Sequence, residues 1–205
     1  MTKAELRQQL RRQRAALDPQ AVRDASRQIE ERVLAMEVVR QAPRVCCYVS
    51  IGAEAPTHRL IESLLAMGKI VAAPRVTHDG RAMQMIEITG LGEMVKGRFG
   101  LLEPPEPPEP PEPPEPPEPR SSCGLDRLGA GDVCLTPCVA VTPHGDRLGM
   151  GGGFYDRWLA EHEAVTAIAL AFESQVVEKI AVEPHDRPVQ FVVTEARVMN
   201  CRAGV

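Results

Sequence analysis

The sequence lacks the features that mark membrane-spanning, secreted and disulfide-rich proteins. No apolar stretch approaches the roughly 20 residues needed to cross a bilayer, and no segment is typical of a signal peptide. The six cysteines follow no disulfide-framework spacing, being at positions 46, 47, 123, 134, 138 and 201. We therefore expect a soluble, cytoplasmic protein with reduced thiols and no membrane partner.

Two cysteines are close enough in sequence to be considered as metal ligands. Cys134 and Cys138 flank the end of an expected strand, but no further Cys or His pair completes a tetrahedral site. We expect both thiols to act as small buried apolar groups.

The net negative charge of the chain depends on one acidic tract. Six of its residues are glutamates, and without them the net charge of −4 becomes +2. A slightly basic remainder suits anionic small molecules, but so small a surplus does not favour nucleic-acid binding. A length of 205 residues suits one α/β domain with a substantial core.

The acidic tract, residues 103–120, consists of five Glu-Pro-Pro triplets followed by Glu118-Pro119-Arg120. Proline removes backbone donors and fixes φ, so we expect an extended polyproline II rod rather than a helix or central strand. We interpret it as a surface insertion without a catalytic role. The alternative is a docking segment for a polyproline-reading partner.

The rest of the chain has alternating helix and strand patterns. Helices are expected at 2–17, from Asp18 to about Val39, and at 57–67, 154–162 and 174–179; strands are expected at 45–50, 70–74, 82–88, 132–136, 165–171 and 190–194. This order predicts an α/β fold: a single three-layer α/β/α domain over residues 1–205, with a mostly parallel, Rossmann-like sheet. Ligands of such sheets bind at the carboxyl ends of strands, where we expect 50–54, 137–153 and Asp186.

The most informative motif is the run from Arg147 to Asp156, which has four glycines within five positions. Glycines before a helix can turn backbone N–H groups toward a phosphate, and the helix N-terminus favours an anion there. Arg147 can pair with the same anion. The alternative is a tight strand-to-helix connection without a ligand. The run matches neither a P-loop nor a dinucleotide fingerprint.

The first predicted helix places Lys3 and Arg7 one turn apart on the same face. They can reach an anionic ligand together. A solvated basic helix face is the alternative.

With these pieces placed, the chain resembles the 5-formyltetrahydrofolate cyclo-ligase (5,10-methenyltetrahydrofolate synthetase) family over nearly its whole length outside the repeat. Five ordered blocks carry the resemblance, and the glycine block is the most specific. They begin at Lys3, Tyr48, Gly97, Pro137 and His185.

The resemblance implies ATP-dependent cyclisation of 5-formyltetrahydrofolate to 5,10-methenyltetrahydrofolate, with ADP and phosphate released and Mg²⁺ required. It implies catalytic roles for Arg147 and Glu54, and a Mg²⁺ site at Asp156 and Asp186. The implied ATP-binding residues are Lys3, Arg7, Arg147, Leu148, Gly149, Met150, Gly151, Gly152, Gly153, Phe154 and Tyr155. The implied folate-binding residues are Val49, Glu54, Phe99, Met150, Gly151, Gly152, Gly153 and Phe154.

Some of these residues also have simpler interpretations. Glu54 could be an ordinary exposed loop glutamate, and Phe99 could be a core residue. We assign no proton-transfer role to His144 or His185. The chain also departs from the family pattern: many relatives have Phe-Asp at Val141-Thr142, and some have lysine at Gly152.

Two other functions remain open at this point. The chain could be a non-catalytic folate- or nucleotide-binding protein whose Glu-Pro-Pro tract recruits a partner. An enzyme of the sugar-phosphate isomerase type is a weaker alternative, because no proton-abstracting carboxylate stands out.

Overall fold

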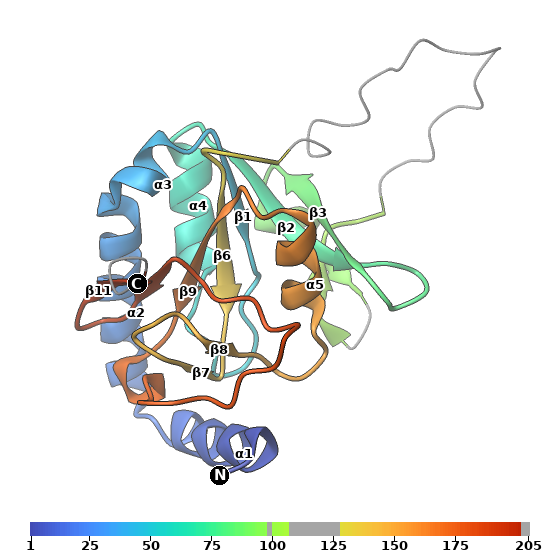
Figure 1. Ribbon diagram of the computed structural model, residues 1–205. Coiled ribbons are helices and arrows are strands. Elements are labelled where there is room, and N and C mark those ends of the chain that lie inside the picture. The colour runs from blue at the N-terminus through green and yellow to red at the C-terminus, as the bar shows by residue number, and fades with distance from the viewer. Residues whose placement is uncertain (98–99, 107–127, 202–205) are drawn as a thin grey trace, which may run out of the picture.

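The computed structural model describes residues 1–97, 100–106 and 128–201 (Figure 1). Its helices are α1 (Lys3–Ala15), α2 (Pro19–Ala35), α3 (Glu37–Gln41), α4 (His58–Ala66) and α5 (Phe154–Glu161), with single 3-10 turns η1 (Leu91–Glu93) and η3 (Glu173–Gln175). Its strands are β1 (Arg44–Cys47), β2 (Ile70–Val76), β3 (Met83–Ile88), β4 (Val95–Lys96), β5 (Leu102–Glu103), β6 (Val133–Pro137), β7 (Ala140–Val141), β8 (Arg147–Leu148), β9 (Thr166–Leu170), β10 (Phe191–Val193) and β11 (Val198–Asn200).

Seven of these strands form one mixed, mostly parallel sheet in the order β11-β10-β9-β6-β1-β2-β3. The inner pairs are parallel, with Cys46 beside Cys134 and Leu135 beside Ile168, whereas β3 and β11 are antiparallel edge strands. The predicted α/β class and mostly parallel sheet are confirmed.

Alternate residues of the inner strands supply two separate apolar clusters. Val45 and Cys47 pack in one cluster with residues of α2, α3 and α4, whereas Cys46 and Cys134 pack in the other with Trp158 of α5. Figure 1 shows α5 apart from α2, α3 and α4. Burial raises the pKa of Cys138 to about 12, so this thiol stays protonated, as expected for a small buried group.

The first two helices begin at the caps that the sequence provides. Thr2 and Glu5 form a reciprocal capping box at α1, and the Asp18 carboxylate accepts the N–H groups of Gln20 and Ala21 at α2. The prediction of one continuous helix to Val39 is wrong. The chain is extended at Met36, which redirects it into α3 and buries Val39 in the core.

The predicted helix at 174–179 is also wrong, because the buried Gln175 side chain fixes a different local structure. Its Oε1 accepts the Phe172 N–H at 2.9 Å, and its amide donates to the carbonyls of Cys138 and Val139 at 2.9 and 3.1 Å. Only the single turn η3 forms there. Expected strand 45–50 ends at Cys47.

The start of the Glu-Pro-Pro tract belongs to the fold. Glu103 lies in β5, which pairs with β4, and only 3% of it is exposed. Because Glu103 and Pro104 are both buried, the exposed part of the tract begins no earlier than Pro105. Residues 107–120, on which the polyproline II expectation mainly rests, lie outside the described residues.

Within the described part of the chain, no helix is both long and apolar enough to span a membrane.

Candidate functional site

A cavity of about 690 Å³ lies at the carboxyl ends of the central parallel strands. Its wall includes the segment after β1, the end of β6, the glycine run between β8 and α5, two α1 side chains and residues 183–186. Every predicted site residue lies on this wall except Phe99, which is outside the described residues. The fold thus brings together side chains from both ends of the chain.

The glycine run connects β8 to α5 through unusual backbone conformations. Gly151 has φ 106° and Gly153 has φ 65°, both in the region that disfavours other residues. Gly149 and Gly152 are close to side chains instead: a Cβ on Gly152 would lie 2.9 Å from the Phe154 ring. The run is therefore a tight strand-to-helix connection, and the N-terminus of α5 opens on the cavity.

Arg147 is buried beside this run and forms an ion pair with Asp156. Its Nη2 lies 2.8 Å from Asp156 Oδ1, with only 2% of the Arg147 side chain exposed. The guanidinium also lies 5.6 Å from the centre of the Tyr155 ring. Asp156 Oδ1 accepts a second bond from the Arg187 N–H at 3.2 Å. This predicted metal ligand is thus held by two donors.

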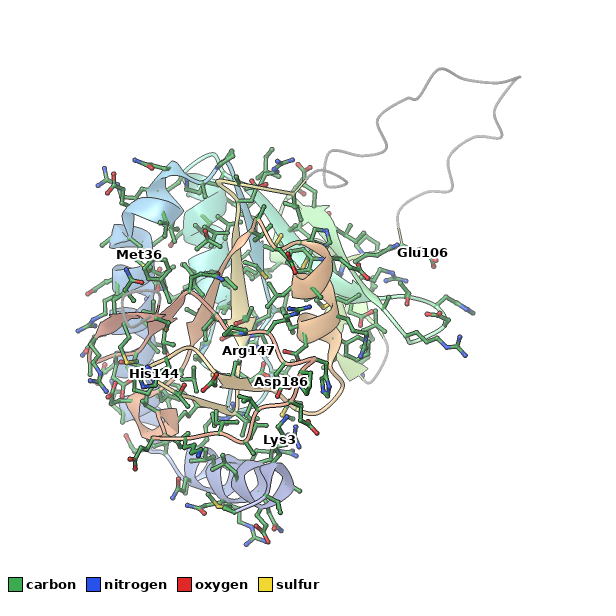
Figure 2. The ribbon with its side chains drawn as sticks, viewed as in Figure 1. Lys3, Met36, Glu106, His144, Arg147 and Asp186 are labelled. Carbon is green, nitrogen blue, oxygen red and sulfur yellow. The ribbon has the colours of Figure 1, made fainter. Side chains whose placement is uncertain are left out.

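Lys3 joins α1 to the C-terminal part of the chain. Its Nζ lies 2.6 Å from Glu183 Oε2 and 2.7 Å from Asp186 Oδ2, and Figure 2 shows Lys3 next to Asp186. Burial alone lowers the pKa of the ammonium, but the hydrogen bonds to the two carboxylates outweigh burial and raise it. Both predicted metal ligands are therefore paired with cations that were predicted to bind ATP.

Arg7 supports the glycine run from the same face of α1. Its Nε donates to the Gly149 carbonyl at 2.9 Å, and its guanidinium lies near Gly151. Leu6 and Leu10 fix the helix by packing against Val139, Ala140 and Leu148. Lys3 and Arg7 thus face the cavity because the apolar side of α1 is buried on the β7–β8 hairpin.

Glu54 lies half-buried on the cavity wall after β1. Its Oε2 accepts the Ile51 N–H at 3.0 Å. Burial raises the pKa of this carboxyl group, although the Ile51 N–H and the charge of Arg14 oppose the shift. The loop is fixed by reciprocal bonds between Ser50 and Thr57, each 3.0 Å long.

Sequence reasoning missed several residues on the wall, and it placed His185 near the site without assigning it a role. Glu183 and His185 lie with Asp186 in a group whose potential ligand atoms are all within 4.8 Å of one another. Their segment has no regular secondary structure, so no periodicity signals it. Further missed residues are Pro74, Val76, Met83, Leu101 and Leu102, which look like ordinary apolar positions in sequence, and Glu103, which looks like part of the repeat.

The departures from the family pattern fall in different places. Gly152 lies on the cavity wall, whereas the described wall includes neither Val141 nor Thr142. Val141 is fully buried, and Thr142 forms a 3.2 Å hydrogen bond with Asp146 inside the hairpin turn. Only the Gly152 difference directly changes the cavity surface.

Comparisons with known proteins agree in assigning a family. Residues 1–195 match the model of the 5-formyltetrahydrofolate cyclo-ligase family. The chain is 34% identical to the 5-formyltetrahydrofolate cyclo-ligase of Escherichia coli K12, covering 92% of this chain and 98% of that protein. It is also 34% identical to the enzyme of the same name from Mycolicibacterium smegmatis, covering 75% of this chain and 74% of that one.

A solved structure shows the same fold. The NMR structure of Aquifex aeolicus 5,10-methenyltetrahydrofolate synthetase superposes with a TM-score of 0.77 at 24% identity, covering all of this chain and 95% of that one. Together with the family match over residues 1–195, this means that the chain belongs to the 5-formyltetrahydrofolate cyclo-ligase family.

Proposed function

We propose that the chain catalyses the ATP-dependent cyclisation of 5-formyltetrahydrofolate to 5,10-methenyltetrahydrofolate, releasing ADP and phosphate. One observation carries the proposal: distant segments bring three cationic side chains, a glycine run at a helix N-terminus and a half-buried carboxylate to one cavity. Membership of the cyclo-ligase family supports the same reaction.

The chemistry requires activation of a poor leaving group. The formyl oxygen on N5 attacks the γ-phosphorus of ATP, and ADP departs. N10 then attacks the activated formyl carbon and loses its proton, and the C–O bond breaks to release phosphate. Phosphoryl transfer of this kind depends mainly on positioning and charge neutralisation.

Three cationic side chains on the cavity wall suit the ATP phosphates. They are Lys3 and Arg7 on α1, together with Arg147 before the glycine run. Backbone N–H groups at the start of α5 add donors and a partial positive charge. In this proposal Arg147 is catalytic because its guanidinium neutralises charge that develops on the transferred phosphoryl group.

The carboxylates on the same wall fit a magnesium ion. Asp156 and Asp186 supply the hard oxygen ligands that Mg²⁺ prefers, and each is already paired with a cation that we assign to ATP. These two residues would hold the ion, which when bound neutralises phosphate oxygens. Lys3 and Arg147 then exchange their carboxylate partners for phosphate oxygens.

Other residues of the cavity wall suit the folate. Glu54 presents a carboxylate that can accept hydrogen bonds from the amino and ring N–H groups of the pterin. Val49 and the apolar residues of β2, β3 and β5 provide surface for the flat ring. Glu54 orients the ring so that the formyl oxygen meets the γ-phosphate.

The direct test is the absorbance of 5,10-methenyltetrahydrofolate formed from 5-formyltetrahydrofolate. We expect its appearance to require both ATP and Mg²⁺, with one ADP released per product. Tight folate binding in a calorimeter without ADP release would contradict the proposal and favour a non-catalytic binding protein.

A further inference from the structure

Glu183 lies on the cavity wall and has no role in the mechanism above. Its Oε2 lies 2.6 Å from Lys3 Nζ, and Oδ2 of Asp186 lies 2.7 Å from the same nitrogen. An ammonium group has three donors, so these two contacts use two of them. The His185 ring is 71% exposed, and its Nε2 lies 3.7 and 3.8 Å from the two carboxylates, too far for a hydrogen bond from that atom. Lys3 is thus held by two carboxylates at once.

A tight turn brings both carboxylates to Lys3. The Asp186 N–H donates to the Glu183 carbonyl at 2.9 Å, which closes a four-residue turn with Pro184 at its second position. The Asp186 carboxylate in turn accepts the Glu183 N–H at 2.7 Å. Since proline fixes φ at this position, the turn has few alternative conformations. The backbone therefore holds the two acidic residues in one arrangement.

The proposed function makes different demands on the two carboxylates. Asp186 has a side chain that is 18% exposed and is a proposed ligand of Mg²⁺, whereas the Glu183 side chain is 55% exposed. When Asp186 turns to the metal ion, Lys3 loses one of its two partners. Glu183 is then the carboxylate that still holds the ammonium group.

The tip of Lys3 needs such a partner. Lys3 is the first residue of α1, so the helix fixes the start of its side chain but not the ammonium group. The four-carbon chain between them is flexible, and ordering it when a ligand binds costs conformational entropy. A side chain that is already held in its binding geometry avoids part of this cost.

We propose that Glu183 is a positioning residue of the ATP site, which keeps the Lys3 ammonium group directed at the phosphates while Asp186 binds Mg²⁺. This inference rests on the proposed function. An acidic group near the phosphates also repels them, but water screens this repulsion because more than half of the Glu183 side chain is exposed. The 2.6 Å contact with Lys3 is direct, so its effect outweighs the repulsion.

The test titrates ATP into full-length wild type, Glu183→Ala, Glu183→Gln and the matched control Glu178→Ala, without folate so that no turnover occurs. Glu178 is an exposed residue of the same segment and does not line the described cavity wall. Loss of a pre-ordered lysine weakens binding roughly threefold to tenfold, and we expect the calorimetric Kd for ATP with Mg²⁺ to rise by that factor in Glu183→Ala. Glu183→Gln should restore most of the affinity, because its amide oxygen still accepts from the ammonium group. Glu178→Ala should match wild type.

Two further measurements identify the partner through which Glu183 acts. Without Mg²⁺, Asp186 still holds Lys3, so Glu183→Ala should change the Kd for ATP by less than about twofold. In a Lys3→Met background, Glu183→Ala should have no further effect, because the two residues act as one unit. The Kd for 5-formyltetrahydrofolate should equal that of wild type in every Glu183 variant.

Several outcomes would overturn the inference. Tighter ATP binding by Glu183→Ala would show that this carboxylate competes with the phosphates for Lys3. An unchanged Kd, an effect of equal size with and without Mg²⁺, or a full effect in the Lys3→Met background would exclude the proposed role. A lower Tm with equal losses of ATP and folate binding would show that Glu183 merely attaches α1 to the rest of the fold.

The proposed function fails in a distinguishable way. If wild-type protein neither binds ATP nor forms product, both proposals are overturned. If wild type is active and the Glu183 variants bind ATP as it does, only the role of Glu183 is lost.

Discussion

The partial burial of Glu54 predicts a measurable pH dependence of stability and of folate affinity. Burial raises the pKa of its carboxyl group above the ordinary value of 4.5, despite the opposing Ile51 N–H and Arg14. The folded state therefore holds this proton more tightly than the unfolded chain does. Its contribution to stability is present below pH 4.5 and is lost as the pH rises through the raised pKa. In the proposed role of Glu54, folate binding has the opposite dependence, because the ionised form is the one that accepts the pterin N–H groups.

We expect folate affinity to fall as the pH is lowered toward the raised pKa of Glu54, and Glu54→Gln to abolish this dependence. The variant should bind folate roughly tenfold to a hundredfold more weakly near neutral pH, with little change in the KM for ATP. Calorimetric titrations between about pH 5 and 8 measure both effects. Glu62→Gln, an exposed change on α4, is the matched control. An unaltered acidic limb in Glu54→Gln would contradict the assignment.

At the scale of helices and strands, long periodic elements were predictable and short ones were not. The inner strands and α4 follow from apolar runs and helical spacing, and the caps at Thr2 and Asp18 locate the starts of α1 and α2. The two-residue strands β4, β5, β7 and β8 are too short to show a period. The extended conformation at Met36 and the hydrogen bonds of the Gln175 side chain depend on tertiary packing. Local propensity therefore does not predict them.

The site residues also differ in how far the sequence predicts them. Arg147, Asp156 and the glycines form one continuous motif, so the sequence identifies them together. The pairing of Lys3 with Glu183 and Asp186 joins segments about 180 residues apart, as the sequence separations of 180 and 183 show. No local pattern encodes it. Glu103 was assigned to the repeat because its sequence context is that of the exposed glutamates.

The glycine run gives the prediction at this scale. Gly151 has φ 106°, so Gly151→Ala forces an L-residue into a conformation that costs about 1–3 kcal/mol. The added Cβ also lies 3.7 Å from the Arg7 guanidinium. We expect denaturant unfolding to show a loss of that size, and steady-state kinetics to show a raised KM for ATP. Gly92→Ala is the control, because its Cβ enters open space. Equal stability of the two variants would contradict this account.

At the scale of the whole molecule, the cavity depends on contacts between the two ends of the chain. Helix α1 is bound to the β7–β8 hairpin by Leu6 and Leu10, and to residues 183–186 through Lys3. The N-terminal helix is therefore part of the cavity wall. Lys3 and Arg147 are each paired with a proposed metal ligand, so the residues that we propose to bind ATP have their charges largely balanced in this structure.

Beyond Glu103, the described residues of the repeat, 104–106, do not line the cavity. The described wall of the cavity contains Glu103 and then resumes at Pro137, and Arg75 already anchors Pro104 and Glu106 to β2. Figure 2 shows Glu106 at the edge of the molecule, away from Lys3, Arg147 and Asp186. Replacement of residues 107–119 by a Gly/Ser linker of equal length removes the prolines but keeps the length of the connection, so it adds little loop-closure cost. We expect kcat and both KM values to stay within about twofold of wild type. A selective rise in the KM for folate would instead assign the repeat a role in access to the pocket, whereas unchanged kinetics would make it a passive insertion.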